Sequence, residues 1–253
     1  MASVESFYKI RRPIIVFCKY VGAEVLTSDK WFHPMSYVLM FHMVAFNVCN
    51  FYTMIQIGSD VKQLMKTTII VGIANQLIFK FFSLLAERRK LRSLFELAEE
   101  RLYRQYQDGS QQEKEIVAKT NRFLEVFWKA LLALYGSTMF VFGLWPVYVY
   151  YKDGELVPLF MYYIPMVSLE STTGYLVTMA FHIDCYTYGI VGCFLTEYAF
   201  IFLSMHALVS VDLFLLHLKE LGVLLRSPRE EETEDAIEQK WTSCVIDHQF
   251  CTE

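Results

Sequence analysis

Long apolar runs dominate the hydrophobic pattern of this chain. The longest extends from Gly174 to Leu218, contains no proline and carries only three acidic side chains. A helix needs about 20 apolar residues to cross the hydrocarbon core of a bilayer, so this run is long enough for a span with an extension. The pattern therefore predicts an all-α membrane protein with four transmembrane helices, over residues 32–57, 67–85, 123–150 and 174–218.

Amphipathic helices are expected to extend two of these spans. After residue 85, Phe95 and Leu102 belong to an apolar series with three- and four-residue spacing, and charged side chains cover the other face. A turn at Asp108-Gly109 is followed by a polar helix that starts near Gln111 and runs into the third span. These stretches are the long cytosolic helical extensions of the predicted fold.

Prolines shape the segment between the third and the fourth span. Pro146 lies where the third span is expected to end, and Pro158 and Pro165 interrupt any long helix between 152 and 173. The residues between the last two prolines are nevertheless rich in aromatic side chains. We therefore expect 152–173 to be an extracellular loop that packs onto the bundle as a lid, and not a fifth span.

Basic residues predict the orientation in the membrane. The N-terminal segment 1–31 carries five lysines and arginines and the connection 86–122 carries nine, whereas the two opposite connections carry two and one. Cytosolic loops of membrane proteins are enriched in these residues. Both termini are therefore predicted to be cytosolic. The apolar piece from Pro13 to Phe17 is too short for the core of a signal peptide.

The tail, residues 226–253, combines an acidic run with a short amphipathic pattern. The run from Glu230 to Asp235 carries five acidic side chains and is expected to be a solvated loop. The side chains that follow it on one helical face are Ile237, Trp241, Cys244, Val245 and His248. We interpret the tail as cytosolic, and as the truncated start of a further helical unit that follows the four-helix bundle of residues 32–225.

The composition supports a membrane protein and limits the kinds of functional site that we expect. Apolar residues make up 55% of the chain, above the roughly 45–50% of soluble domains. The net charge of −4 does not indicate binding to nucleic acid. None of the six cysteines forms a CxxC pair or a Cys/His metal spacing, and neither a nucleophile–base pair nor a phosphate loop is evident. We therefore expect no metal, no cofactor and no enzymatic activity.

Two stretches resemble a known receptor family. The sequence VDLFLLHLKELGVLL, from Val211 to Leu225, has an aspartate followed by an aliphatic helix with a histidine, and CVIDHQF, from Cys244 to Phe250, combines isoleucine with histidine. With the proline- and tyrosine-rich loop before the fourth span and the inverted orientation, they resemble the insect odorant receptor family, and mosquito members in particular. The similarity covers the whole chain but only the first four of the family's seven spans.

The resemblance implies a chemosensory, ligand-gated cation channel. In this family a subunit pairs with a shared co-receptor in a tetramer, in the plasma membrane of sensory neuron dendrites, and the last helix lines the pore. We therefore expect an odorant receptor subunit whose partners are membrane lipid, co-receptor subunits and a small volatile ligand. Because spans five to seven lie outside this sequence, we expect a truncated gene model, a splice form or a partial clone that gives no current alone.

The odorant pocket is expected in the outer halves of spans two, three and four. Such a site is apolar and concave with a few polar groups, and methionines adapt its shape. Thr178 and the tyrosine hydroxyls are placed to orient a polar ligand end. The candidate ligand-binding residues are Ile73, Leu77, Met139, Phe140, Gly143, Leu144, Tyr148, Tyr175, Thr178, Met179 and Tyr188. For each of them, plain helix packing is the alternative interpretation.

A non-signalling membrane scaffold or a transporter fragment is the alternative function. A transporter should show inverted repeats and broken helices with charges at the midplane, and no internal repeat is evident. Glu197 and Asp212 are the deep acids of the fourth span, and Lys80 is their one evident basic partner in the membrane. A rhodopsin-like receptor would need an extracellular N-terminus, which the counts of basic residues oppose.

Overall fold

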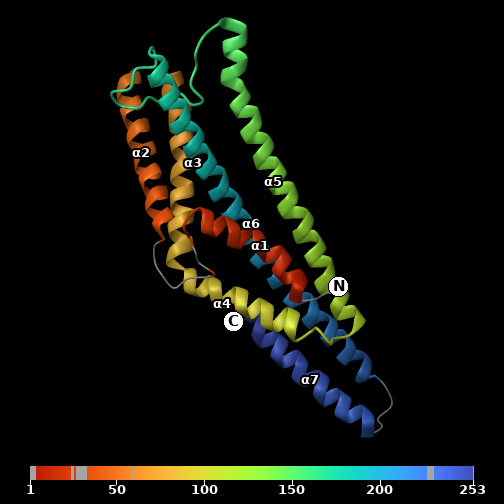
Figure 1. Ribbon diagram of the computed structural model, residues 1–253. Coiled ribbons are helices and arrows are strands. Elements are labelled where there is room, and N and C mark those ends of the chain that lie inside the picture. The colour runs from red at the N-terminus through yellow and green to blue at the C-terminus, as the bar shows by residue number, and fades with distance from the viewer. Residues whose placement is uncertain (1–3, 24–25, 27–32, 59, 227–230, 253) are drawn as a thin grey trace. The chain divides into compact units, whose positions relative to one another are not determined.

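The structure, a computed structural model, is built from helices (Figure 1). It describes residues 4–23, 26, 33–58, 60–226 and 231–252, and no strand occurs within these ranges. Residue 32, where the first span is expected to begin, lies outside them. Four helices are long and apolar enough to cross a membrane: α2 (Pro34–Ile57), α3 (Val61–Ala86), α5 (Gln111–Asp153) and α6 (Thr172–Leu224). The predicted class of all-α membrane protein is confirmed.

Shorter elements complete the chain. They are α1 (Val4–Tyr20), α4 (Arg88–Ala98), the π-helix η1 (Glu99–Arg104) and α7 (Glu231–Thr252). The chain divides into two compact units, and α1, α4, α5 and α6 contribute residues to both. The first unit comprises Met1–Pro13, Arg92–Trp128 and Ala199–Glu253, and the second comprises Ile14–Leu91 and Lys129–Tyr198.

Capping side chains explain where α2 and α3 begin. The Nδ1 of His33 accepts a hydrogen bond from the backbone N–H of Met35 at 3.3 Å, and a proline follows His33 at the first helical position. Asp60 caps α3, because its carboxylate accepts from the N–H of Gln63 at 3.1 Å. α3 therefore starts at Val61, before the apolar run at residue 67 begins.

The helix expected to continue from the second span is interrupted once. α3 ends at Ala86, and the N–H of Glu87 bonds back to the carbonyl of Ser83 at 3.0 Å before α4 begins. The amphipathic pattern after this break is confirmed, since Phe95 and Leu102 are both 2% exposed.

Two further local expectations are wrong. Pro146 does not end the third long helix, because α5 continues to Asp153. A proline removes one backbone hydrogen bond, and membrane helices tolerate this loss through small local adjustments. The acidic run does not remain a loop, because α7 begins at Glu231, and the helix dipole favours acidic side chains in a first turn. Glu230 lies outside the described residues.

Aromatic rings form the core of the first unit. Phe7 of α1 lies against Tyr103 of η1, with ring centroids 4.7 Å apart, and Phe95 of α4 stacks on Phe202 of α6 at 4.8 Å. Each of the four side chains is at most 2% exposed. Burial of a large apolar side chain contributes about 1.5–3 kcal/mol, so these contacts hold α1, α4, η1 and α6 together within the unit.

One carboxylate is buried beside this core. Glu99 accepts hydrogen bonds from Tyr8 at 2.8 Å and from Arg104 at 2.7 Å, and Arg11 lies 3.3 Å from its other oxygen. Burial alone would raise the pKa of this carboxyl. The hydrogen bonds from Arg104 and Tyr8, with the charges of both guanidinium groups, outweigh burial and hold the Glu99 pKa below its ordinary value.

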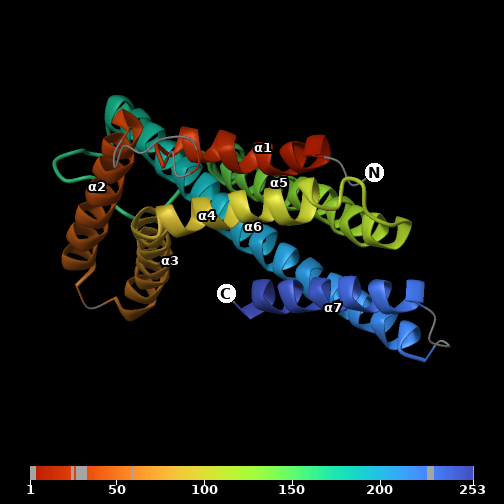
Figure 2. The same cartoon turned by 90° about the horizontal axis from the view of Figure 1, so that it is seen from below.

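In the second unit, α2 and α3 lie side by side in both views (Figures 1 and 2). The segment 154–171 is irregular and is attached to α2 and α6. The N–H of Tyr163 donates to the Thr53 hydroxyl at 2.7 Å, and the N–H of Phe160 donates to Nδ1 of His182 at 3.2 Å. Tyr162, between these two anchors, is 1% exposed, so the aromatic centre of the segment packs onto the helices.

We expect Glu99→Gln to lower the free energy of unfolding by about 1–3 kcal/mol near neutral pH, because the charge-assisted hydrogen bonds weaken. A carboxyl whose folded pKa is lowered stabilises the fold above its unfolded pKa, about 4.3, and this stabilisation is lost as pH falls through the folded value. The difference from wild type should therefore disappear between about pH 5 and pH 3.

Thermal unfolding in detergent micelles, followed by circular dichroism across this pH range, measures the effect. Glu100→Gln is the matched control, because the Glu100 side chain is exposed on the same π-helix. Equal destabilisation by the two variants, or a difference that grows as pH falls, would contradict the role given to Glu99.

Candidate ligand-binding site

A groove in the second unit has one face of α6 as its floor. Tyr188, Gly192 and Thr196 line it at four-residue spacing, which places them on the same side of the helix. The groove holds about 10 Å³ of free space, room for a single water molecule, so its walls are in contact. The walls are Val21 after α1, Leu39 and Met43 of α2, Leu77, Phe81 and Leu84 of α3, and Leu195 of α6.

The absence of a side chain at Gly192 brings α3 close to α6. A Cβ atom at this position would lie 2.8 Å from Cδ1 of Leu77, which is closer than carbon atoms approach. The side chain of Leu77 therefore occupies the space that a larger residue on α6 would fill. Because this end of Leu77 is flexible, it is the part of the wall that can move most easily.

Two pairs of ionisable side chains lie beside the residues that line the groove. His42 of α2 is 2.5 Å from Asp184 of α6, and Lys80 of α3 pairs with Glu197 of α6. Asp184 and Glu197 are 13 residues apart, about 20 Å along a helix, with the groove floor between them. Ionisable residues in membrane helices are costly and commonly mark functional sites. The first pair joins α6 to α2 and the second joins α6 to α3, the two helices that supply most of the groove walls.

The structure brings two of the eleven predicted contact residues together in the groove, Leu77 and Tyr188. Of the others on α6, Thr178 is 1% exposed, and the hydroxyl of Tyr175 donates to the carbonyl of Val157 at 3.3 Å. The remaining seven are exposed (Ile73, Phe140, Gly143, Leu144, Tyr148) or half-buried (Met139, Met179). Ligand contact by these residues stays a prediction.

The first span contributes to the groove, and sequence reasoning missed it. Leu39 and Met43 line the groove, and His42 contacts Asp184 in one of the two flanking pairs. The available signal is the polar residues of that apolar run, because a polar group in a membrane helix normally faces protein. His42 and Asn50 follow this rule, since Asn50 is 1% exposed.

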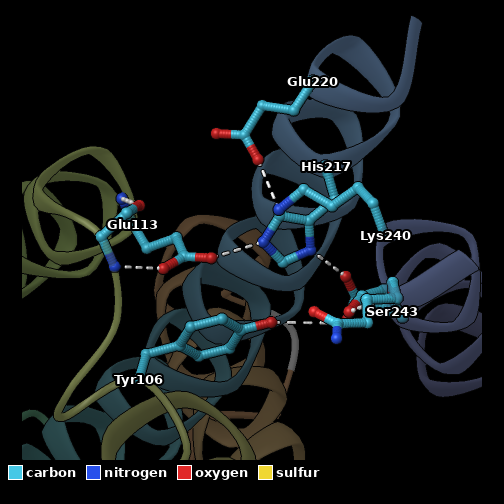
Figure 3. A network of polar contacts seen from close by, with 9 residues as sticks. Tyr106, Glu113, His217, Glu220, Lys240 and Ser243 are labelled. Atoms are coloured by element: carbon cyan, nitrogen blue, oxygen red, sulfur yellow. Dashed lines mark hydrogen bonds and ion pairs between the residues drawn. The ribbon is translucent and has the colours of Figure 1, made fainter. Parts of the chain in front are cut away.

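A second group of polar side chains lies in the first unit (Figure 3). The Nε2 of His217 on α6 is 2.6 Å from Glu113 of α5, and its Nδ1 is 2.5 Å from Asp247 of α7. Each ring nitrogen therefore faces a carboxylate, an arrangement that suits a doubly protonated imidazole, with a proton on each nitrogen. The Tyr106 hydroxyl donates to Asp247 at 3.3 Å, and Lys240 pairs with Glu220 at 2.5 Å.

This network joins the start of α5, the end of α6 and α7 within the first unit. Burial, then the charges of Asp247 and Glu113, raise the pKa of Tyr106 far above its ordinary value, so its hydroxyl remains a donor. Among the described residues, no group of three or more His, Cys, Asp or Glu side chains is arranged to hold a metal ion. The geometry supports a clamp that positions α7, which lies alongside the last turns of α6 in both views (Figures 1 and 2).

Comparison with known proteins gives one match. The family model described as 7tm Odorant receptor matches residues 60–252, which is 193 of the 253 residues. The matched range begins at the cap of α3 and includes every groove residue on α3 and α6, as well as the whole polar network of the first unit. The chain matches no curated protein and no solved structure.

We expect Asp247→Ala to release α7 from the end of α6. The substitution leaves His217 and Tyr106 buried without this partner, and removing one member of a buried ion pair costs about 3–5 kcal/mol. Hydrogen–deuterium exchange of the α7 amides, read by mass spectrometry, should accelerate at least about tenfold.

Thr242→Ala is the control on the same helix. Its exposed hydroxyl bonds only to the carbonyl of Glu238, one turn earlier, so the substitution should leave the exchange of α7 unchanged. Unaltered exchange in Asp247→Ala would show that the network does not hold α7.

Proposed function

Because this chain belongs to the odorant receptor family, we propose that it is a receptor subunit that binds a small volatile ligand in the groove of the second unit. With co-receptor subunits it gates a cation channel in the plasma membrane of sensory neuron dendrites. The family match, which covers the groove residues of α3 and α6, carries this proposal. It favours a receptor over a membrane scaffold or a transporter fragment.

The lining of the groove supports a volatile ligand. Small-molecule sites are lined mainly by apolar and aromatic side chains with a few polar groups that fix orientation. Eight of the ten lining residues are apolar or glycine, and Tyr188 and Thr196 carry the hydroxyls. The Thr196 hydroxyl already donates to the Gly192 carbonyl at 3.0 Å, and the surface that the groove presents is apolar.

A ligand enters by moving side chains. Met43 is unbranched and adapts its shape, and the end of Leu77 lies against Gly192. A ligand that displaces Leu77 from Gly192 pushes α3 away from α6. The Lys80–Glu197 pair joins the same two helices about one turn away, so occupancy of the groove strains this pair. We infer that the pair transmits ligand binding to the rest of the bundle.

We expect Gly192→Ala to change ligand selectivity in the receptor that contains this chain, co-expressed with the co-receptor. The added methyl group meets Leu77 and removes groove volume, and one methyl group of contact is worth about 1–3 kcal/mol. Across a panel of volatiles, the half-maximal concentrations of the largest agonists should rise about tenfold or more, with smaller effects on the smallest agonists.

Gly189→Ala is the matched control, three residues earlier on α6. A Cβ atom at Gly189 meets no atom within 4 Å, so this variant should keep the wild-type ranking of ligands. Odorant-evoked currents are compared at equal surface expression. An unchanged ranking in Gly192→Ala would contradict the assignment of the groove as the ligand site.

We also propose that both termini are cytosolic and that the segment 154–171 is extracellular, as the counts of basic residues indicate. Glu155 and Ser171, near the two ends of this segment, are both exposed. In a background without native thiols, Glu155→Cys and Ser171→Cys should each react with an impermeant thiol reagent added to intact cells. Reaction of either only after permeabilisation would reverse this orientation.

A further inference from the structure

Among the described residues of α2, α6 and the segment 154–171, three buried side chains carry polar atoms with no hydrogen-bond partner. They are Oδ1 of Asn50, Oγ1 of Thr178 and Nε2 of His182, and each side chain is at most 1% exposed. A fourth, the hydroxyl of Tyr162, meets no nitrogen or oxygen partner and reaches only the thiol of Cys185. Buried polar groups are nearly always paired, so four such atoms in one unit need an explanation.

Three elements bring these side chains together. The ring of Tyr162, in the segment 154–171, lies 4.1 Å from the ring of His182 on α6. Thr178 lies four residues before His182, on the same face of α6. On α2, Asn50 lies four residues after Phe46, whose ring is 5.1 Å from that of Tyr162. Asn50 and Thr178 each lie one turn from a residue whose ring contacts Tyr162, so the four side chains face the same region between α2, α6 and the segment.

The donors and acceptors of the cluster define what it can bind. Nδ1 of His182 accepts from the N–H of Phe160, so the proton of the neutral ring is on Nε2, and the backbone of Tyr162 is the protein group with which a ligand would share this ring. The amide nitrogen of Asn50 donates to the carbonyl of Phe46 at 2.7 Å, which leaves Oδ1 as an acceptor. The Thr178 hydroxyl can do both. A ligand group that fits these atoms must therefore both donate and accept a hydrogen bond.

We propose that Asn50, Tyr162, Thr178 and His182 form a subsite for a hydroxyl group, and that this receptor prefers volatile alcohols to aldehydes and hydrocarbons of equal length. The inference rests on the proposed function and adds the chemical class of the ligand. An aldehyde oxygen accepts from His182 but offers no proton to Asn50, and a hydrocarbon satisfies neither. A site built to hydrogen-bond a hydroxyl strongly rejects the analogue that lacks it.

A continuous series of ring contacts links this subsite to the groove. The ring of Tyr188, in the groove, lies 5.1 Å from His42, which is stacked at 6.2 Å on Phe181. Phe181 in turn lies 6.4 Å from Tyr162. The hydroxyl subsite and the apolar groove are thus neighbouring parts of one unit. Access to the subsite requires displacement of the segment 154–171, which the Tyr163–Thr53 and Phe160–His182 hydrogen bonds hold in place.

The test compares octanol, octanal and octane on the receptor that contains this chain, co-expressed with the co-receptor. Thr178→Val keeps the shape of the side chain and removes its hydroxyl, and His182→Phe keeps a ring and removes the donor. We expect each variant to raise the half-maximal concentration of octanol at least tenfold, and those of octanal and octane less than threefold. Thr187→Val is the control, because the exposed Thr187 hydroxyl bonds only to the Ile183 carbonyl of its own helix.

The outcomes separate this inference from the proposed function. Currents evoked by octanal or octane as strongly as by octanol, with both variants unchanged, would leave the receptor role standing and overturn the hydroxyl subsite. If no volatile evokes current above the co-receptor alone, the proposed function fails. Direct binding then decides the subsite, by saturation-transfer NMR of octanol and octane on the purified receptor in detergent.

In that measurement, a subsite for the ligand hydroxyl predicts that octanol binds better than octane and that Thr178→Val abolishes the difference. Water is the other molecule that presents a hydroxyl to the cluster. If the cluster holds only water, octanol and octane bind alike in wild type and variant, and the inference is overturned.

Discussion

A polar side chain inside a bilayer has no water to bond, so it must find a partner in the protein. α6 carries such side chains along its 53 residues, and this need determines what packs against it. In the second unit Asp184 pairs with His42 of α2, and Glu197 pairs with Lys80 of α3. Each pair attaches a different helix to α6, and the apolar groove lies along the face between them.

Burial imposes a similar requirement in the first unit, because a polar group inside a packed core is also cut off from water. The ring of His206 bonds to the hydroxyl of Tyr103 on η1 at 2.8 Å, and His217 joins α5 and α7 through Glu113 and Asp247. The aromatic core beside them supplies apolar burial, which has no fixed direction. The hydrogen bonds fix which turn of each element lies against which turn of α6. Apolar burial holds the unit together, and the polar side chains of α6 determine where along α6 each neighbouring element packs.

Apolar burial and hydrogen bonding thus have different roles, and this difference explains how far the sequence can predict the structure. A helix that crosses lipid needs a long apolar run, so the helical class follows from the hydrophobic pattern. The start of α5 at Gln111 follows from the turn at Asp108-Gly109 before it. Partner choice does not follow, because it depends on how α2 and α3 are rotated against α6. Lys80 is recognisable as a possible partner of Glu197, but nothing local pairs His42 with Asp184.

The residues of the candidate site are also difficult to predict from the sequence. Lipid is as apolar as a ligand pocket, so a side chain that faces lipid and one that lines a groove have the same chemistry. Phe140 and Leu77 are equally plausible contacts in the sequence, yet Phe140 is 67% exposed and Leu77 lies against Gly192. Polar residues carry more information than apolar ones here. A hydroxyl or an imidazole in an apolar helix must face something specific.

Polar side chains on α6 therefore fall into two groups, those that have a hydrogen-bond partner on another helix and those that keep an unpaired polar atom. Asp184, Glu197 and His217 have partners on other helices, and their bonds position those helices. Thr178 and His182 keep an atom unpaired although they are as deeply buried as any residue of the core. Folded proteins break the rule of satisfied polar groups mainly at functional sites. The constraint that assembles the helices thus also separates buried positions whose bonds hold the fold from buried positions whose polar atoms stay unpaired.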